Sequence, residues 1–311
     1  MTPGSRTAYF GASGARKNAI DLKGLREALQ VRNTVIDCFE EAEWLRGNFG
    51  DDLLTFVFVG GGPTGVEGAA DTYDLIFGVL KDDYPMVDFG RVRLILVNSG
   101  EHILKGLDPS LANAATRRLA TQRVEVINNA KVEQLRPDSV RLSNGRTIPT
   151  RTTVWAAGIE PAPLVENLDV QRDDRGRILV DEFLRVKDES GVYAVGDRAR
   201  IDYDGPPIPA LAQAAEQEGK RAASNLASEV DGGTLVAFRY RHLGQLVDLG
   251  ESSALTDILG IKISGVLGDL IWKGVYLYEL GYNLNRAQVL ADWLISLFAR
   301  PDTSRLFEEE R

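Results

Sequence analysis

The sequence predicts an α/β fold with a doubly wound parallel sheet. Residues 53–59 form an unbroken apolar run with β-branched and aromatic side chains, which is typical of a strand buried on both faces. Similar short runs recur along the chain, separated by segments with helical spacing. Strands that alternate with helices in this way build a parallel sheet. The strands expected in this sheet are residues 53–59, 92–97, 124–127 and 153–157.

Length and composition are those of a globular protein. The 311 residues correspond to about two domains. With 44% hydrophobic and 26% charged residues, the chain falls outside the disordered and fibrous classes. The net charge of −9 argues against a nucleic-acid partner. Because there is no signal-like start and no run of ~20 apolar residues, we expect an acidic intracellular protein that does not span a membrane.

Cysteine and histidine are too rare in this sequence for disulfide or dithiol chemistry and for a metal site. Cys38 is the one cysteine, which excludes a disulfide framework and a paired-cysteine redox centre. His102 and His242 lie far apart in sequence. We therefore predict no metal site.

The segments before and after the first strand have clear local patterns. Residues 1–13, rich in Gly, Ser, Thr and Pro, are expected as a loop. Residues 21–44 carry apolar side chains near i, i+4 spacing, which predicts a helix, and residues 47–52 end it. A second helix, of small residues, is expected over 68–80.

Farther along, three short segments indicate an antiparallel meander with a turn at Asn144-Gly145. A new segment starts near Pro161, and from residue 237 a strand-like run leads into a part rich in Trp, Tyr and Leu. The expected meander strands are residues 131–135, 139–142 and 146–149, and the later elements are strands at 178–181 and 192–195 and a helix at 209–230.

A glycine-rich turn joins the first strand to the helix after it. Gly60, Gly62 and Gly65 form the pattern GxGxxG. The first glycine suits a tight turn, the second lets a pyrophosphate approach the backbone, and the third lets the helix pack against the strand. Free N–H groups and the helix dipole then face the phosphates. In this context the pattern predicts a dinucleotide site, and the alternative is a tight turn without a ligand.

Two polar residues accompany this turn. Asn98 follows the second strand, where an acidic residue usually bonds the ribose hydroxyls. Asparagine can bond a hydroxyl but does not repel a 2′-phosphate, so the choice between NADH and NADPH stays open. Glu67, two residues after Gly65, is expected in the first helical turn, where a carboxylate interacts well with the helix dipole. An equally weighted alternative has Glu67 facing the nicotinamide cleft.

These residues resemble a known family. FVFVGGGPTGVE at residues 56–67 resembles the second dinucleotide fingerprint of type II NADH dehydrogenases, which are non-proton-pumping NADH:quinone oxidoreductases of the two-dinucleotide-binding-domain flavoprotein fold. WAAGI at 155–159 is similar to the family's strand end beside the NAD. VYAVGD at 192–197 resembles the flavin fingerprint, whose aspartate bonds the ribityl chain. AQAAEQ at 212–217 matches the AQxAxQ segment under the isoalloxazine, which borders the quinone site.

The resemblance implies two cofactors, FAD and NAD(H), and a set of site residues. Glu67, Gln213 and Gln217 would be catalytic, with Glu67 orienting the nicotinamide or handling protons. From position alone, glutamines spaced i, i+4 more often lie on a solvated helix face, and Asp197 could cap a helix. The residues implied in cofactor binding are Gly60, Gly62, Pro63, Thr64, Gly65, Glu67, Asn98, Ala157, Gly158, Gly196, Asp197, Gln213, Ala214 and Ala215.

One part of the family pattern has no counterpart here. In the family, a first GxGxxG domain that binds the ADP half of FAD precedes these motifs, whereas PGSRT at residues 3–7 resembles the loop that closes that domain. We therefore expect roughly a hundred N-terminal residues to be missing, so the retention of FAD and catalysis by this chain alone are open questions. The expected organisation is a remnant of the FAD domain with a linker helix at 1–50, an NAD(H)-binding domain at 51–160, the returning part of the FAD domain at 161–235, and a C-terminal segment at 236–311.

The C-terminal segment contains an apolar helical stripe with arginines around it. Such a helix suits the surface of a membrane. From spacing alone, packing on the protein's own core or on a partner in a homodimer is favoured, whereas the resemblance implies a peripheral membrane anchor. The stripe consists of Val289, Leu290, Trp293, Leu294, Leu297 and Phe298, flanked by Arg286, Arg300 and Arg305.

The leading interpretation is a flavin-dependent NADH:quinone oxidoreductase, peripheral at the cytoplasmic face of the cell membrane. NADH would bind at the glycine-rich turn and pass a hydride to the flavin, and the electrons would then pass to a quinone. Two alternatives stay open. One is a soluble NAD(P)H-dependent flavin reductase for an electron-carrier protein, and the other is a flavin-poor chain without catalysis.

Overall fold

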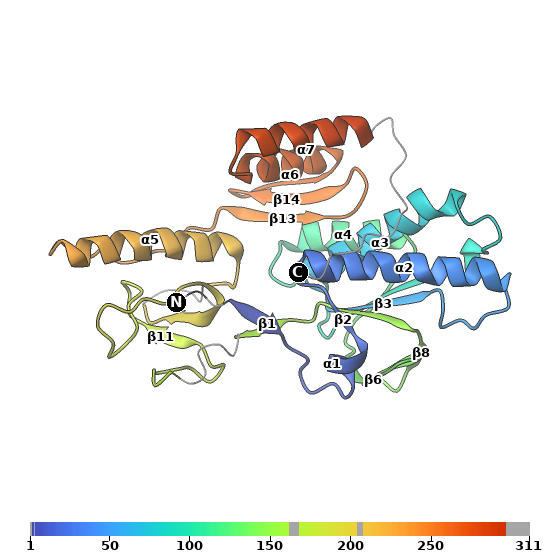
Figure 1. Cartoon of the computed structure of the whole chain (residues 1–311), viewed down its shortest axis with the longest axis horizontal. Coiled ribbons are helices and arrows are strands. Elements are labelled where there is room, and N and C mark those ends of the chain that lie inside the picture. The colour runs from blue at the N-terminus through green and yellow to red at the C-terminus, as the bar shows by residue number, and fades with distance from the viewer. Residues whose placement is uncertain (1, 3, 162–167, 204–207, 297–311) are drawn as a thin grey trace. The chain divides into compact units, whose positions relative to one another are not determined.

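The structure, a computed structural model, describes residues 2, 4–161, 168–203 and 208–296 (Figure 1). Its internal contacts divide the chain into two compact units. The smaller unit consists of Met1–Ala8 and Ile159–Leu243, and the larger of Tyr9–Gly158 and Gly244–Arg311. Each unit is therefore built from two stretches that are far apart in sequence.

A five-stranded parallel sheet forms the centre of the larger unit. The four predicted strands are confirmed, with small shifts at their ends. A fifth, two-residue strand stands where the sequence predicts the beginning of a helix. The strands, in order across the sheet, are β2 (Ile20–Asp21), β9 (Thr152–Trp155), β3 (Thr55–Val59), β4 (Arg93–Val97) and β5 (Val124–Ile127).

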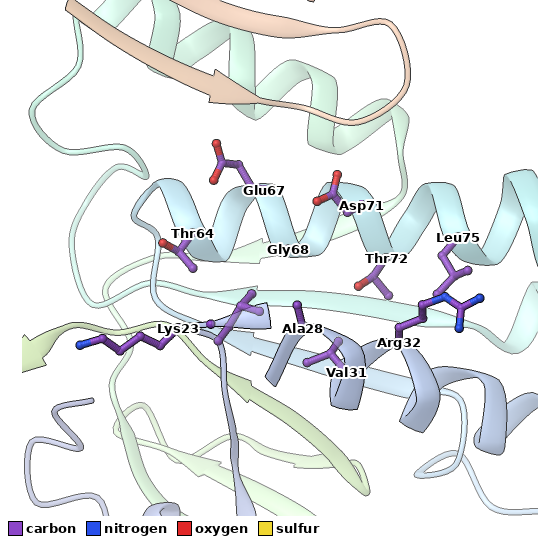
Figure 2. Close-up of a pocket in the computed structure, with 12 residues that line it drawn as sticks. Lys23, Ala28, Val31, Arg32, Thr64, Glu67, Gly68, Asp71, Thr72 and Leu75 are labelled. Atoms are coloured by element: carbon purple, nitrogen blue, oxygen red, sulfur yellow. The ribbon is translucent and has the colours of Figure 1, made fainter. Parts of the chain in front are cut away.

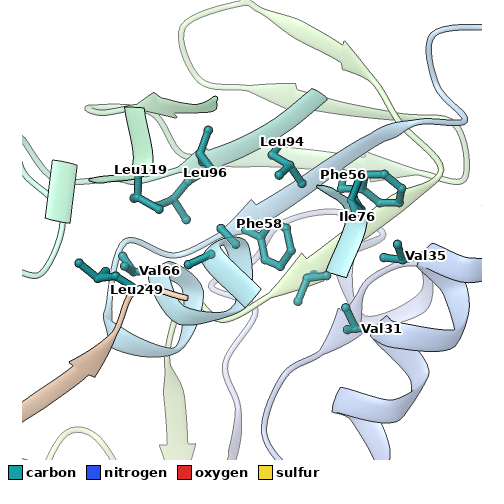
Figure 3. Close-up of a cluster of buried hydrophobic side chains, with 14 of the residues drawn as sticks. Val31, Val35, Phe56, Phe58, Val66, Ile76, Leu94, Leu96, Leu119 and Leu249 are labelled. Carbon is teal, nitrogen blue, oxygen red and sulfur yellow. The ribbon is translucent and has the colours of Figure 1, made fainter. Parts of the chain in front are cut away.

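The two faces of this sheet have different covers. Phe56 and Phe58 of β3 enter a core shared with three helices (Figure 3), whereas Val57 and Val59 enter a second core shared with an antiparallel meander. This differs from a doubly wound sheet, in which helices cover both faces, because the chain after β5 forms the predicted meander strands instead of a helix. The helices are α2 (Leu25–Leu45), α3 (Pro63–Asp74) and α4 (Pro109–Thr121); on the meander side lie α1 (Ala15–Asn18), β6 (Val132–Arg136), β7 (Ser139–Leu142) and β8 (Thr147–Pro149).

Helix α3 begins earlier than the sequence pattern predicts. Its first residue is Pro63, five positions before the expected start, because proline suits the first helical position: its φ is already helical and it has no N–H to leave unbonded. Beyond Asp74 the chain stays helical but changes from the α pattern to short π and 3-10 turns. These turns are a π turn at Leu75–Val79 and 3-10 turns at Leu80–Asp82 and, farther along, Phe89–Arg91.

The smaller unit holds two short strand pairs and one long helix. The loop expected at residues 1–13 contains a strand, β1, which pairs with β10. The strand expected at 192–195 is wrong: this buried segment makes a single antiparallel bridge, between Tyr193 and Arg185, which does not extend into a ladder. Its two hydrogen bonds run from the N–H of Val186 to Val192 and from the N–H of Ala194 to Leu184. The elements are β1 (Ser5–Thr7), β10 (Ile159–Pro161), β11 (Ile178–Val180), a 3-10 turn (Gly196–Arg198), β12 (Ala199–Ile201) and α5 (Ala212–Val230).

The C-terminal stretch of the larger unit is a three-stranded antiparallel sheet followed by two helices. The strand-like run expected from residue 237 begins as a strand only at Gly244, and the next two strands were not expected. Val247 and Leu255 of this sheet, and Leu249 in the connection between β13 and β14, belong to the same core as α2, α3 and α4. No helix among the described residues is long and apolar enough to cross a membrane. The elements are β13 (Gly244–Asp248), β14 (Ala254–Ile258), β15 (Ile261–Gly265), α6 (Val266–Glu279) and α7 (Asn283–Ser296).

The unit boundaries differ in part from the expected organisation. Residues 9–50, which the sequence assigns to a remnant of the FAD domain and a linker helix, belong to the larger unit. The reason is that β2 pairs with β9 and that α2 buries Val35 and Phe39 in the core of the parallel sheet. The other boundaries, after Gly158 and after Leu243, lie near the expected ones at residues 160 and 235.

Candidate active site

The three glycines of the turn after β3 differ in what surrounds them. A Cβ on Gly60, whose φ is +122°, would lie 2.4 Å from the carbonyl oxygen of Ala156. A Cβ on Gly65 would lie 1.9 Å from the carbonyl oxygen of Gly60. A Cβ on Gly62 would meet no described atom within 4 Å. The first and third glycines are thus required by the fold, whereas the second faces open space beside the backbone, as an approaching pyrophosphate requires.

The start of α3 completes a cradle for an anion. Gly62 is the N-cap residue, and no described side chain caps the helix there. Pro63 and Thr64 follow as the first helical residues. The backbone N–H groups of this first turn are therefore available to a phosphate, which the positive end of the helix dipole also attracts. These residues fit a pyridine dinucleotide.

The residues that follow β9 lie against the same turn. The Cα of Ala157 would be 2.7 Å from a Cβ on Gly60. Gly158, with a φ of +154°, faces the ring of Phe10, whose nearest atom would be 2.9 Å from a Cβ on that glycine. Larger side chains in place of Gly60 and Gly158 would fill the space at this edge of the sheet, so glycines are needed to leave it accessible to a ligand.

Asn98 is held firmly beside the turn. Its side chain is 8% exposed, and its Nδ2 donates hydrogen bonds to the carbonyl oxygen of Gly100 at 3.0 Å and to Oδ1 of Asn128 at 2.8 Å. A Cβ on Gly61 would lie 2.6 Å from Asn98 Oδ1. The side chain of Asn98 thus lies directly against Gly61 of the turn, and a neutral amide stands where the sequence pattern expects a carboxylate.

Glu67 lies in the second turn of α3, and no acidic residue occupies the first turn. The expectation that it interacts with the helix dipole from the first turn is therefore wrong, because α3 starts at Pro63. Its Oε1 instead accepts a hydrogen bond from the backbone N–H of Asp248 in β13, at 3.0 Å. Burial raises the pKa of Glu67, and the negative charge of Asp248 adds to that rise.

Glu67 also lines a pocket of about 460 Å³ between α3 and the beginning of α2. Figure 2 shows Glu67 and Asp71 projecting from the same side of α3, away from Ala28 and Val31 of α2. The pocket is part apolar and part charged. Its lining is Leu22, Lys23, Gly24, Ala28, Val31, Arg32, Thr64, Glu67, Gly68, Asp71, Thr72 and Leu75.

Two further carboxylates of α3, Asp71 and Asp74, were missed in the sequence. Burial, together with the charges of Asp248 and Glu67, raises the pKa of Asp71 to about 7. Asp74 accepts a hydrogen bond from the backbone N–H of Glu251. The spacing 67, 71 and 74 places three carboxylates on one helix face, which the sequence could have revealed.

The flavin fingerprint forms a tight turn in the smaller unit. Gly196 has a φ of +75°, and a Cβ there would lie 3.4 Å from Cβ of Ala215 in α5. Asp197 accepts a hydrogen bond from the hydroxyl of Ser5 through Oδ2, at 2.7 Å. Ala214 is buried beneath the first turn of α5. An acceptor at the end of such a turn, beside a helix start lined with small residues, fits the ribityl chain and ring of a flavin.

The two glutamines of α5 bond the backbone of the chain that leaves the smaller unit. Gln217 Oε1 accepts from the N–H of Arg241 at 3.0 Å, and its Nε2 donates to the carbonyl oxygen of Arg241 at 2.9 Å. Gln213 Oε1 accepts from the N–H of Leu243 at 3.0 Å. Both side chains thus fasten residues 241–243 to α5, and a catalytic role of Gln213 and Gln217 stays a prediction.

Comparisons with known proteins agree with this arrangement. The model of the pyridine nucleotide-disulphide oxidoreductase family matches residues 4–219. A probable NADH dehydrogenase from Dictyostelium discoideum is 33% identical over 305 residues, covering 97% of this chain and 67% of the relative. The type II NADH:quinone oxidoreductase NdhA from Mycobacterium tuberculosis is 31% identical over 315 residues, covering 96% and 66%. The chain spans about two thirds of the length of these relatives.

Among solved structures, NDH2 from Plasmodium falciparum in complex with NADH has a TM-score of 0.85 with 19% sequence identity. The match covers 96% of this chain and 77% of the Plasmodium chain. At this identity the match establishes a shared fold.

Proposed function

The chain belongs to the pyridine nucleotide-disulphide oxidoreductase family and, within it, to the type II NADH dehydrogenases, and from this premise we propose that it is a flavin-dependent NADH:quinone oxidoreductase. The observation that carries the proposal is the glycine-rich turn. Two of its glycines are required by the packing of β3 and α3, while Gly62 leaves the backbone open toward a ligand. A tight turn without a ligand would not need a glycine at position 62.

The residues of the chain have distinct tasks in this proposal. The turn at Gly60, Gly62 and Gly65 and the first N–H groups of α3 bind the pyrophosphate of NADH. The carboxylate of Asp197 accepts a hydrogen bond from a ribityl hydroxyl of FAD. The flavin, when bound, supplies the redox chemistry that takes a hydride from NADH and passes electrons to a quinone. Burial raises the pKa of Glu67, so its carboxyl keeps a proton to a higher pH than an exposed glutamate does. Gln213 and Gln217 keep the chain at 241–243 on α5, beside the ring.

The experiment that tests this function is the visible spectrum of the purified chain with FAD, before and after addition of NADH without oxygen. We expect flavin absorption bands that NADH bleaches and that a short-chain quinone restores. Bleaching that only an electron-carrier protein reverses would favour the flavin reductase. The absence of flavin bands after reconstitution would refute the proposal. Because Asn98 carries no charge, NADPH is expected to bleach the bands as well, at a rate within about tenfold of NADH.

We also propose that α6 and α7 bind the cytoplasmic face of a membrane. Large apolar side chains are exposed on this segment, as an interfacial helix requires. Arg286, expected as a flanking cation, donates hydrogen bonds to the carbonyl oxygens of Tyr278 and Leu280, and Leu297, Phe298, Arg300 and Arg305 lie outside the described residues. The exposed side chains are Val266, Leu267, Leu270, Tyr276, Tyr278, Tyr282, Leu284, Leu290, Leu294 and Ile295, and Leu259 and Ile261 are exposed in the sheet before α6.

The chain is therefore expected to float with lipid vesicles in a density gradient. Leu267→Glu together with Leu270→Glu should release it, because charges replace two apolar side chains that are 66% and 60% exposed. Val230→Glu is the control, since Val230 of α5 is 79% exposed but lies outside the C-terminal segment. A chain that stays off vesicles and forms a dimer in gel filtration would show that a second copy covers this surface instead.

A further inference from the structure

A buried carboxylate of α5, Glu218, has no part in the function described so far. It directly follows Gln217, and only 4% of its surface is exposed. Its Oε2 accepts a hydrogen bond from the backbone N–H of Gly196 at 2.5 Å. Burying a carboxylate costs free energy unless it accepts hydrogen bonds. The burial of Glu218 therefore depends on the N–H of Gly196, and the hydrogen bond in turn holds Gly196 in place.

The turn at Gly196 and Asp197 is fastened from two sides. Glu218 holds the N–H of Gly196, and the hydroxyl of Ser5 holds the carboxylate of Asp197. Gly196 also lies in the left-handed region, with a φ of +75°. A small number of hydrogen bonds therefore holds the conformation of the turn. Among those described, the bond to Glu218 is the only one whose acceptor is a titratable side chain of α5.

The charges around Glu218 come from the turn and from its own helix. Asp197 and the buried Arg198 belong to the turn packed against α5. On α5, Glu216 and Lys220 are exposed and form an ion pair, and Glu229 accepts a hydrogen bond from Tyr193. Burial and the charge of Asp197 raise the pKa of Glu218 to about 7, against the opposing effect of the Gly196 N–H.

We propose that Glu218 is a positioning residue for the Gly196–Asp197 turn and that its carboxylate takes up a proton when FAD binds. The inference rests on the proposed flavin function. FAD is an anion, and negative charge brought to this turn adds to that of Asp197 and favours the neutral form of the already buried Glu218. Its pKa is therefore higher with FAD bound than without it.

The direction of the pH dependence follows from linkage. Below the pKa of the free protein, Glu218 is protonated in both states and the affinity for FAD is constant. As the pH rises above about 7, Glu218 of the free protein loses its proton at a lower pH than Glu218 of the FAD complex. Binding of FAD must then restore this proton to Glu218. The affinity for FAD therefore falls by up to about tenfold per pH unit.

The test measures the dissociation constant of FAD, from the quenching of its fluorescence, between about pH 6 and pH 8.5. For the wild-type chain we expect the constant to rise about tenfold over this range. Glu218→Gln keeps an acceptor for the Gly196 N–H but cannot titrate, so its constant should stay near the low-pH value of the wild type. Glu216→Gln, on the same helix but exposed, should follow the wild type.

Calorimetry of the wild-type chain, in buffers with different ionisation enthalpies, counts the protons taken up and does not depend on any variant. A pH-independent affinity in the wild type, or an unchanged slope in Glu218→Gln, overturns the coupling and leaves the proposed function standing. Failure of every variant to bind FAD at any pH overturns the flavin function and the coupling together.

Discussion

Replacing Gly62 with alanine is expected to weaken NADH binding about 10- to 100-fold without a change in the stability of the chain. The backbone of Gly62 has a φ of −78°, which alanine adopts freely, and a Cβ there meets no described atom within 4 Å. The methyl group would instead meet the pyrophosphate. An intruding methyl group in a close contact costs roughly 1–3 kcal/mol, which gives this fold-change. Isothermal calorimetry with NADH and the thermal unfolding midpoint measure the two effects separately.

Two other glycines provide the comparison for this variant. Gly65→Ala should lower the unfolding midpoint as well as the affinity, because its Cβ would lie 1.9 Å from the carbonyl oxygen of Gly60. Gly78→Ala, in a helical turn with open space around it, should change neither. If Gly62→Ala binds NADH as the wild type does, the pyrophosphate does not lie at this turn.

Replacing Glu67 with glutamine is expected to slow quinone reduction about 100-fold or more while the reduction of the flavin by NADH keeps its rate. Reduction of a quinone to a quinol consumes two protons, and Glu67 is a half-buried carboxyl whose raised pKa keeps it protonated to a higher pH than an exposed glutamate. Glutamine preserves the hydrogen bond from the N–H of Asp248 but carries no acidic proton. Stopped-flow absorbance resolves the two half-reactions.

Asp74→Asn is the matched control for Glu67. Asp74 lies two turns farther along α3 and accepts a backbone N–H of the same C-terminal segment, but it does not line the pocket. Asp74→Asn should leave the rates of both half-reactions unchanged. The pH dependence gives a second criterion: quinone reduction by the wild type should slow as the pH rises and Glu67 loses its proton, whereas the residual rate of Glu67→Gln should not follow this titration. Equal quinone rates for Glu67→Gln and wild type would exclude a role in proton transfer.

The parts of the site that the sequence predicts correctly are those within one short segment. Gly60, Gly62 and Gly65 lie between a strand and a helix, and the strand–turn–helix geometry follows from six consecutive positions. The surroundings of Glu67 could not be predicted in this way. Its acceptor contact reaches Asp248, far along the chain, and nothing local indicates that β13 would pack against α3. The same holds for the backbone contacts of Gln213 and Gln217.

The sequence alone determined the parallel sheet, the meander, the nucleotide turn and the family, because strand periodicity, glycine requirements and motif order are properties of neighbouring residues. Only the tertiary structure decided which element covers each face of the sheet and where residues 9–50 belong. It also decided that Glu218 is buried and that packing and neighbouring charges raise the pKa values of Glu67, Asp71 and Glu218. Burial depends on contacts between distant segments. A carboxylate therefore acquires an unusual pKa from what packs over it, and its own sequence neighbours do not carry that information.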